Sequence, residues 1–346
     1  MKQMHFERYV DLKPFNTFGI SAEADALGWF ADVDALRGML DATKGLKRLV
    51  LGGGSNILLT QDFKGVVLVN ELPGMELLRE DEENVWVRAG AGLVWHDLVV
   101  QCVRRGWGGI ENMSLIPGKV GAAPMQNIGA YGVELKDVFH DLQALRIEDG
   151  EHITFDKAAC AFGYRESFFK REGRDRFVIL NVTLRLSKRP EVNTSYGNIQ
   201  QELDKRGIAS PTIADVSDAV IAIRRSKLPD PAVIGNAGSF FKNPIVTAEV
   251  ATRIRTEHPD MPGYPVTGHS ANSQAPAVKL AAGWLIEKAG WKGYREGAFG
   301  VHAAQALVLV NHGGAKGKDI FNLSTRIVED VKQRFGVELE REVNIL

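Results

Sequence analysis

The sequence predicts a mixed α+β protein with more than one domain. Its 346 residues exceed what a single hydrophobic core usually supports, so two or three domains are expected. Amphipathic helical patterns and short apolar strand patterns follow one another along the whole chain. Long glycine-rich segments interrupt these patterns, and a long irregular segment inside a compact domain is usually functional.

Local signals place the expected elements. The expected helices are residues 32–43, 94–105, a segment around Val250 and Ile254, 276–289, and 319–335. The expected strands are residues 48–51, 65–69, 85–87, a hairpin over 142–155, 177–186, 306–310 and 337–346. Gly106 is the expected stop of the second helix, and Asp149-Gly150 is the expected hairpin turn. Ser273 and Pro276 are the expected start signals of the 276–289 helix.

Composition excludes several classes of protein. Hydrophobic residues make up 45%, charged residues 25%, and the formal net charge is -1, so neither nucleic acid nor an anionic membrane is an expected partner. The first residues lack the apolar region of a signal peptide, and no apolar run approaches the ~20 residues of a membrane span. We therefore expect a cytoplasmic protein. The two cysteines, Cys102 and Cys160, allow no disulfide framework, and the eight histidines show no metal-ligand spacing.

A first candidate site follows the strand at 48–51. Three glycines, Gly52, Gly53 and Gly54, come directly before Ser55 and Asn56. Successive N–H groups in such a turn can form a nest for phosphate oxygens, and glycine lets the backbone approach a ligand closely. A tight connection between two strands is the alternative. The spacing is not G-x-G-x-x-G, so a Rossmann dinucleotide site is not indicated.

A second candidate site is the segment from Ser114 to Gly132. Its residues are small and carry few charges, so the chain could lie flat against a planar ligand and offer backbone groups to it. A buried loop packed for structural reasons is the alternative. The two glycine-rich segments together favour a large ligand with a phosphate part and an aromatic part.

Two further blocks could act on a substrate. Arg165 lies in a glycine turn beside Tyr164 and could clamp a carboxylate, or it could simply lie over the aromatic ring at the surface. Ser239 lies between two glycines and two phenylalanines in the block 235–244. Its hydroxyl could face a reacting atom, or the block could be a turn with a hydrophobic anchor. No catalytic triad accompanies Ser239, so nucleophilic catalysis is not predicted.

The C-terminal segment 337–346 alternates apolar and polar residues. A period of two places Glu338, Glu340 and Glu342 on one face of a strand. The pattern alone favours a solvated face and does not choose among the three carboxylates.

Taken together, these blocks resemble one family, the bacterial UDP-N-acetylenolpyruvoylglucosamine reductases. The resemblance spans nearly the whole chain in the family's order, and the Tyr196-Gly197-Asn198 insert resembles the longer type I branch. The blocks that carry it are Asn16-Thr17-Phe18-Gly19, Leu51 to Asn56, Ile116 to Gly132, Phe162 to Ser167, Arg225 to Pro231, Gly235 to Pro244, Ala281 to Ile286, and Leu339 to Val343.

The resemblance implies a particular domain organisation. It implies an FAD-binding module of the vanillyl-alcohol-oxidase/PCMH type with two subdomains, followed by a C-terminal α+β substrate-binding domain. We expect the first subdomain at 1–72, with residues 343–346 returning to it, and the second at 73–228. The substrate-binding domain is expected at 229–342, after a boundary marked by the prolines at 229 and 231.

The resemblance also implies a reaction in peptidoglycan precursor synthesis. NADPH would reduce FAD, and the hydride would then pass to the enolpyruvyl ether of UDP-N-acetylglucosamine, giving UDP-N-acetylmuramate. Ser239 would protonate the carbon next to the carboxylate, with Arg165 and Glu342 as the other catalytic residues. The usual family pattern near the end is Leu-Glu-Pro-Glu-Val, and here Arg341 replaces the proline, so Glu340 stays an alternative to Glu342.

Binding residues are carried over in the same way. The expected FAD-binding residues are Gly52, Gly53, Gly54, Ser55, Asn56, Ser114, Ile116, Pro117, Gly118, Gly121, Ala122, Gln126, Asn127, Gly129, Ala130 and Tyr131. The expected residues at the sugar nucleotide or the pyridine nucleotide are Tyr164, Tyr196, Lys227 and Asn243. We expect a monomer that binds a small sugar nucleotide and no metal. A flavin oxidase of the same fold and a flavin-binding sensor without turnover are the alternatives.

Overall fold

A computed structural model describes residues 5–266 and 277–346, which form two compact units. Unit 1 contains the residues up to Val10, Glu23–Gly54 and Phe63–Ser226. Unit 2 contains Asp11–Ala22, Ser55–Asp62 and Lys227–Leu346. Each unit is therefore assembled from segments that lie far apart in the sequence.

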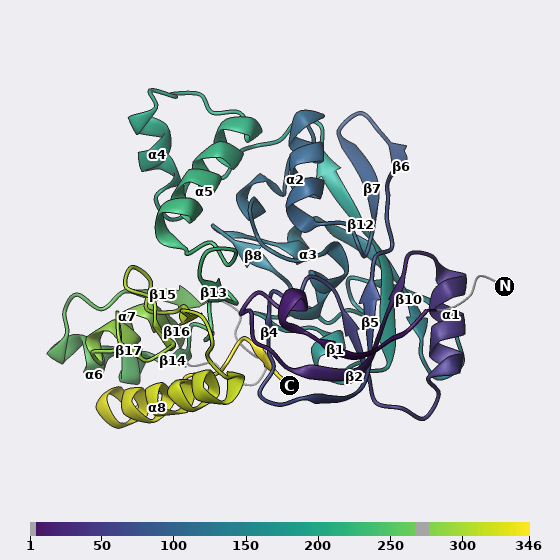
Figure 1. The fold of residues 1–346 in the computed structure, drawn as a ribbon. Coiled ribbons are helices and arrows are strands. Elements are labelled where there is room, and N and C mark those ends of the chain that lie inside the picture. Colours follow the sequence, from purple (N-terminus) through teal and green to yellow (C-terminus); the bar gives the residue numbers. More distant parts are fainter. Residues whose placement is uncertain (1–4, 267–276) are drawn as a thin grey trace. The chain divides into compact units, whose positions relative to one another are not determined.

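Two sheets form the framework of unit 1 (Figure 1). The first has the order β1-β2-β5-β3, in which β5 pairs in parallel with both β2 and β3. The second has the order β11-β10-β12-β7-β6 and is antiparallel throughout. The strands of these sheets are β1 (Glu7–Asp11), β2 (Glu23–Phe30), β3 (Arg48–Leu51), β5 (Phe63–Asn70), β6 (Met75–Glu80), β7 (Asn84–Gly90), β10 (Phe139–Arg146), β11 (His152–Asp156) and β12 (Phe177–Ser187). A short pair, β8 (Gly129–Ala130) and β9 (Val133–Glu134), lies in the second glycine-rich segment.

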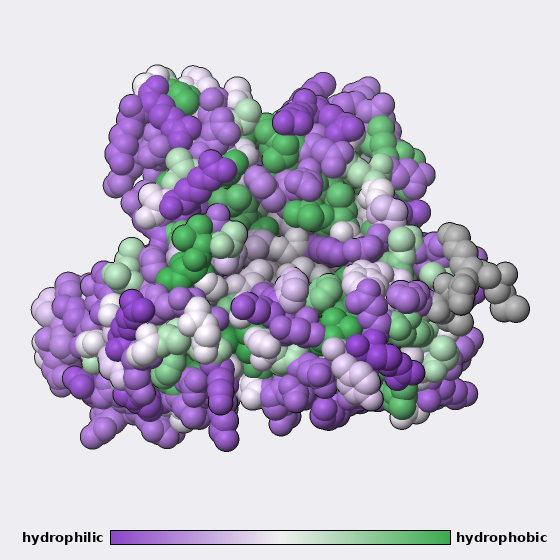
Figure 2. Space-filling view, in the orientation of Figure 1, coloured by the Kyte–Doolittle hydropathy of each residue, from purple (hydrophilic) through white to green (hydrophobic). Residues whose placement is uncertain are grey.

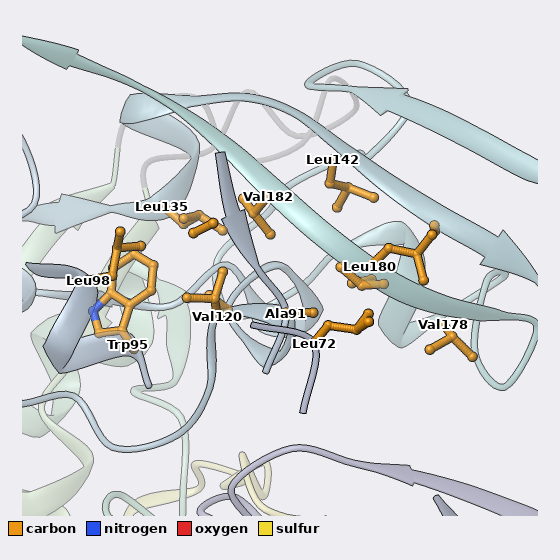
Figure 3. Packing of buried hydrophobic residues seen from close by; sticks show 14 of the residues in the cluster. Leu72, Ala91, Trp95, Leu98, Val120, Leu135, Leu142, Val178, Leu180 and Val182 are labelled. Atoms are coloured by element: carbon orange, nitrogen blue, oxygen red, sulfur yellow. The ribbon is translucent and has the colours of Figure 1, made fainter. Parts of the chain in front are cut away.

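Helices and irregular chain close the core of unit 1. Helix α1 (Val33–Ala42) begins at Asp32, whose carboxylate accepts the Ala35 N–H at 2.7 Å. Helix α2 (Trp95–Arg104) buries Trp95, Leu98, Val99 and Cys102, and the short α3 is Leu135–Val138. Figure 3 shows side chains from α2, from the strands and from the 3-10 helix that begins at Val120 packed in one cluster. The second glycine-rich segment is thus anchored in the main core.

A helical hairpin of unit 1 has its own small core. Helices α4 (Ile199–Lys205) and α5 (Ile213–Lys227) bury Ile199, Leu203, Val216, Ala219, Val220 and Ile223 against one another. Tyr131 of the second glycine-rich segment packs on the same cluster. The sequence predicted no helix here because these apolar residues are diluted by many polar ones.

The described residues of unit 2 contain three small sheets and three α-helices. One sheet has the order β13-β19-β18-β17, a second has the order β14-β16-β15, and in the third β20 pairs in parallel with β4. The strands are β4 (Ile57–Leu58), β13 (Gly235–Asn236), β14 (Ile245–Thr247), β15 (Gly263–Val266), β16 (Ala277–Leu280), β17 (Arg295–Glu296), β18 (Phe299–Val301), β19 (Leu309–Asn311) and β20 (Asn344–Ile345). The helices are α6 (Ala248–Glu257), α7 (Ala282–Lys288) and α8 (Gly317–Phe335).

The long helix α8 is amphipathic. Ile320, Leu323, Ile327, Val331 and Phe335 are buried at helical spacing. In the view of Figure 2, the surface of α8 is mostly hydrophilic. Within residues 5–266 and 277–346, no helix combines the length and the apolar content of a membrane span. In the same residues, no group of three or more His, Cys, Asp or Glu is placed to hold a metal ion.

Most predicted elements are confirmed, and three need correction. The helix predicted at 276–289 is strand β16 followed by the shorter α7, because residues 277–280 pair with β14 and β15. Ser273 and Pro276, its predicted start signals, lie outside the described residues. The strand predicted at 306–310 begins only at Leu309. The segment 337–346 is a regular strand only in β20, although Val337, Leu339 and Val343 are buried as the alternation predicted.

Candidate active site

The two glycine-rich segments of unit 1 meet at their glycines. A Cβ atom on Gly53 would lie 3.0 Å from the Cα atom of Gly118, and a Cβ atom on Gly52 would lie 3.6 Å from the Cβ of Lys119. Both Gly54 and Gly118 have positive φ, 61° and 109°. Because glycine has no Cβ and can adopt positive φ, the two backbones can come into direct contact here. The sequence predicted that these segments serve one ligand, and the fold places them side by side.

Backbone hydrogen bonds hold the second segment against the core. The Trp95 N–H donates to the Gly118 carbonyl at 3.0 Å, and the Val120 N–H donates to the Leu93 carbonyl at 2.8 Å. Val120 is fully buried. A Cβ atom on Gly121 would lie 2.6 Å from the Ala91 Cβ. Gly121, predicted to bind a cofactor, is therefore needed for packing as well.

Left-handed backbone is concentrated in this region. Among the described residues, seven non-glycine residues have positive φ, and four of them lie in the predicted site segments: Leu115, Asn127, Tyr131 and Arg165, with φ of 58°, 44°, 49° and 54°. Such conformations cost of order 1–3 kcal/mol each and persist where the surrounding structure enforces them, often at ligand sites. They turn carbonyl and N–H groups away from regular pairing.

The turn that carries Arg165 is clamped onto the second glycine-rich segment. The Ser167 hydroxyl donates to the Met125 carbonyl at 2.7 Å, and the Asn127 amide donates to the Gly163 carbonyl at 3.0 Å. The Arg165 Nη2 donates to the Gly129 carbonyl at 2.8 Å. The predicted substrate arginine and the predicted flavin loop are therefore one rigid piece of unit 1, with the Arg165 guanidinium 5.6 Å from the Tyr164 ring centroid.

Two predicted cofactor residues have their side chains engaged inside unit 1. The hydroxyl of Ser114, fully buried, contacts the Glu111 carbonyl at 2.7 Å and the Ser217 hydroxyl at 2.8 Å. The Asn127 side chain is hydrogen bonded to Glu134, to Gly163 and to the Lys136 N–H. Any contact of these two residues with a ligand would fall to their backbone. Ile116, Pro117, Ala122, Gln126 and Ala130 lie along the same segment.

Arg224 is a further candidate site residue, to which the sequence alone gave no role. It lies on α5, and among the described residues its buried Nε has no hydrogen-bond partner. Burial lowers its pKa, and it interacts electrostatically with Tyr131, whose own pKa burial raises. A half-buried guanidinium of this kind fits an anionic ligand. The glycine contact, the left-handed backbone and this cation together fit a ligand with phosphate groups and a planar ring, as FAD has. In the sequence, Arg224 is followed closely by Arg225 and Lys227, and such a group of basic residues is typical of a solvated surface.

In unit 2, Ser239 is held between two fixed points. The buried Asn236 side chain accepts the Gly238 N–H at 2.9 Å, and its amide donates to the Ile234 carbonyl at 2.9 Å. On the other side, the Phe240 N–H donates to the Leu307 carbonyl at 2.8 Å. Phe240 is fully buried and anchors this block in the core. Ser239 itself is half-buried and follows Gly238, which has a φ of 68°.

Glu342 lies directly beside the Ser239 block. Its N–H donates to the Phe240 carbonyl at 2.8 Å, and the Lys242 N–H donates to the Glu340 carbonyl at 2.9 Å. The Glu340 side chain is 67% exposed and pairs with the buried Lys242 ammonium at 2.5 Å. Glu342 is half-buried. The two carboxylates that the sequence could not separate thus have different surroundings.

The remaining predicted residues take several positions. The Asn56 amide donates to the Glu342 carbonyl at 3.3 Å, so Ser55 and Asn56 belong to unit 2 while the three glycines before them belong to unit 1. Asn243 accepts the Ala282 N–H at 3.0 Å, at the start of α7. Lys227 is the exposed last residue of α5, and Tyr196 is 41% exposed.

Of the three predicted catalytic residues, the fold brings Ser239 and Glu342 together in unit 2 and carries Arg165 in unit 1. His302, two residues after Gly300, is half-buried, and burial lowers its pKa. Cys102 is fully buried, and burial raises its thiol pKa to about 12, as expected of an inert core residue.

Comparison with known proteins gives two family matches. Residues 230–346 match the family described as UDP-N-acetylenolpyruvoylglucosamine reductase, C-terminal domain, and residues 29–156 match the FAD binding domain. These matches confirm the predicted α+β fold with an FAD-binding module followed by a C-terminal reductase domain.

Relatives cover the whole chain. The UDP-N-acetylenolpyruvoylglucosamine reductase of Pseudomonas aeruginosa is 53% identical over 344 residues, 99% of each chain. That of Flavobacterium johnsoniae is 48% identical over 344 residues, 99% of this chain and 100% of its own. Among solved structures, the enzyme of Thermus caldophilus is 26% identical, with a TM-score of 0.66 over 99% of each chain.

Proposed function

Because the chain belongs to the UDP-N-acetylenolpyruvoylglucosamine reductases, we propose that Arg165, Ser239 and Glu342 carry out the substrate chemistry of this family in it. The protein is an FAD-dependent oxidoreductase that uses NADPH to reduce UDP-N-acetyl-3-O-(1-carboxyvinyl)-glucosamine to UDP-N-acetylmuramate, in peptidoglycan precursor synthesis. FAD, when bound, would carry two electrons from NADPH to the enolpyruvyl group. The observation that carries the residue assignment is the bond from the Glu342 N–H to the Phe240 carbonyl, 2.8 Å, next to Ser239.

Ser239 is the proposed proton donor. After hydride reaches the terminal carbon of the enolpyruvyl group, negative charge develops on the carbon beside the carboxylate. The Ser239 Oγ–H gives its proton to that carbon, since a carbanion is basic enough to take a proton from a serine hydroxyl. Anchors at Asn236 and Phe240 hold the Ser239 backbone in place on both sides, which keeps the hydroxyl in a defined position.

Arg165 is the proposed partner of the substrate carboxylate. As charge develops, the carboxylate gains enolate character, and a fixed guanidinium stabilises that charge more than it stabilises the ground state. The bonds from Ser167 to Met125 and from Asn127 to Gly163 fix the turn that carries Arg165. A preorganised cation needs little rearrangement during the reaction.

Glu342, rather than Glu340, is the proposed catalytic carboxylate. The ion pair with Lys242 occupies the exposed Glu340 carboxylate, whereas Glu342 is half-buried beside the Ser239 block. A partly buried carboxylate next to the proton donor can polarise the hydroxyl or relay its proton.

The residues proposed to hold FAD are the glycine-rich segments and Arg224. The backbone at Gly52–Gly54 and at Gly118 offers N–H groups to phosphate oxygens, and Arg224 offers a cation. Tyr164, Tyr196, Lys227 and Asn243 are proposed to bind the sugar nucleotide or NADPH. We also propose that the protein works as a monomer in the cytoplasm, which light scattering on the purified protein and cell fractionation would test.

Two half-reactions followed anaerobically by flavin absorbance test the assignment. In Ser239→Ala, bleaching by NADPH should keep its normal rate, because no substrate proton is involved. Reoxidation by the enolpyruvyl sugar nucleotide should slow by about 10²–10⁴-fold. Thr247→Ala, which removes the hydroxyl that caps α6 in the same unit, should leave both rates unchanged.

Other outcomes point elsewhere. Equal slowing of both half-reactions in Ser239→Ala would make Ser239 a binding or structural residue. Bleaching by NADPH with reoxidation by oxygen alone would favour a flavin oxidase. A wild-type protein that takes up FAD but is not bleached by NADPH would favour the sensor.

A further inference from the structure

Arg341, the residue before Glu342, is bound to helix α8. Its Nε donates to the Ser324 hydroxyl at 2.8 Å, and its Nη2 donates to the Thr325 hydroxyl at 2.7 Å. The guanidinium carbon lies 4.7 Å from the ring centroid of Phe321. These three partners lie at positions i, i+3 and i+4 of α8, and such residues share one helix face.

The two hydroxyl groups that accept from Arg341 are oriented by helix α8 itself. The hydroxyls of Ser324 and Thr325 both donate to the Phe321 carbonyl, at 2.6 and 3.2 Å. Their hydrogens point along the helix, so their lone pairs are left to accept from a donor outside it. A guanidinium has two adjacent N–H groups in a fixed plane and can use both lone pairs while stacking on the ring, whereas an ammonium presents a single point charge.

The backbone next to this contact is the backbone that carries Glu342. Arg341 and Phe241 face each other in a single antiparallel bridge, whose two hydrogen bonds run from Lys242 to Glu340 and from Glu342 to Phe240. This bridge is isolated, outside any named strand, and the Asn56 amide also donates to the Glu342 carbonyl at 3.3 Å. Successive side chains of an extended segment point to opposite sides. The hydrogen bonds from Arg341 to α8 therefore fix the direction in which the Glu342 side chain points.

We propose that Arg341 is a positioning residue for Glu342: it clamps the C-terminal segment to α8 and so fixes where the Glu342 carboxylate lies. The inference rests on the proposed function of Glu342. Without the clamp, the segment can shift by a fraction of an ångström while unit 2 stays folded, and displacement of a catalytic group by about 1 Å can cost about 10²-fold in rate.

The test measures both half-reactions in the FAD-loaded protein, together with thermal unfolding. Arg341→Ala should slow reoxidation by the enolpyruvyl sugar nucleotide about 10- to 100-fold and leave reduction by NADPH unchanged. The paired change Ser324→Ala with Thr325→Val removes the two hydroxyl groups but keeps the charge. It should slow reoxidation to a similar extent and add little to Arg341→Ala.

Arg326→Ala is the matched control. Arg326 is also bound on α8, by Glu296 and by the Tyr294 hydroxyl, and its loss should lower the unfolding temperature without slowing reoxidation. Normal reoxidation in Arg341→Ala would overturn the inference. Equal slowing of both half-reactions would also overturn it. So would slow reoxidation in Arg341→Ala together with normal reoxidation in the Ser324→Ala/Thr325→Val variant, because the effect would then come from the lost charge. Glu342→Gln separates the two proposals, because normal reoxidation in that variant means that the proposed function of Glu342 has failed.

Discussion

The contact between the two glycine-rich segments predicts a sharp difference between neighbouring glycines. In Gly53→Ala, the new methyl would lie 3.0 Å from the Gly118 Cα and 3.6 Å from the Gly118 carbonyl carbon. Carbon atoms in contact prefer about 3.5–4.0 Å, so one backbone must move by roughly half an ångström. The obstacle is main chain and cannot rotate away. In Gly52→Ala, the nearest atom is a side-chain Cβ at 3.6 Å, an ordinary contact.

The magnitude follows from the cost of overpacking. Forcing a methyl into occupied space costs about 1–3 kcal/mol. If bound FAD needs the native spacing of the two segments and the free protein can relax, this cost appears as weaker binding. At about 1.4 kcal/mol for each factor of ten, Gly53→Ala should raise the FAD dissociation constant about 5- to 150-fold. Gly53 does not have positive φ, unlike Gly54, so backbone strain does not complicate the comparison.

Titration of the FAD-free protein, followed by quenching of flavin fluorescence, measures this constant directly. Gly52→Ala is the control and should bind FAD within about threefold of the wild type, since an ordinary contact costs little. Thermal unfolding without FAD checks that both variants fold. The reasoning is refuted if Gly53→Ala binds FAD as tightly as the wild type, or if both variants weaken binding equally.

Three other predictions follow from the described contacts. His96 accepts the Leu115 N–H at Nδ1, and burial lowers its pKa. Its contribution to stability is therefore present above the unfolded pKa of about 6.5 and is lost as pH falls below that value. His96→Asn should flatten the decline in unfolding free energy between about pH 7.5 and 5.5, and an unchanged decline would contradict this. Glu340→Gln leaves the buried Lys242 ammonium without its carboxylate and should cost about 1–2 kcal/mol in urea unfolding, while turnover continues. Ser167→Ala removes the hydrogen bond to the Met125 carbonyl and should lower the free energy of unfolding by about 1–3 kcal/mol. The rate of sugar-nucleotide reduction should fall more than the rate of NADPH oxidation. Equal losses would show that the turn has no special role in the substrate half-reaction.

Local patterns predicted the fold where local signals dominate. The strand at 48–51 and the helix at 94–105 carry unambiguous apolar periods, and the structure has β3 and α2 there. Residues 277–280 were misread because a short apolar run fits a helix as well as a strand. Only pairing with β14 and β15, distant in sequence, decides in favour of β16.

The sequence alone does not show how the predicted site residues depend on distant parts of the chain. The order of the glycine-rich segments could be read from the sequence, but their contact at Gly53 and Gly118 could not. The sequence alone assigned Arg224 no role, and only the fold shows that its Nε is buried. Glu340 and Glu342 have the same sequence pattern, and the fold distinguishes them by the ion pair of the exposed Glu340 with Lys242 and by the partial burial of Glu342.

The division of the first glycine-rich motif has a physical consequence for the second unit. Gly54 ends a segment of unit 1, and Ser55 begins a segment of unit 2. The Asn56 carbonyl accepts the Asn344 N–H at 3.1 Å, and its amide donates to the Glu342 carbonyl at 3.3 Å. Unit 2 therefore cannot set the position of Glu342 from its C-terminal residues alone. Parallel pairing of β20 with β4 requires a segment almost three hundred residues away, so the proposed catalytic carboxylate reaches its place only when the ends of the chain have come together.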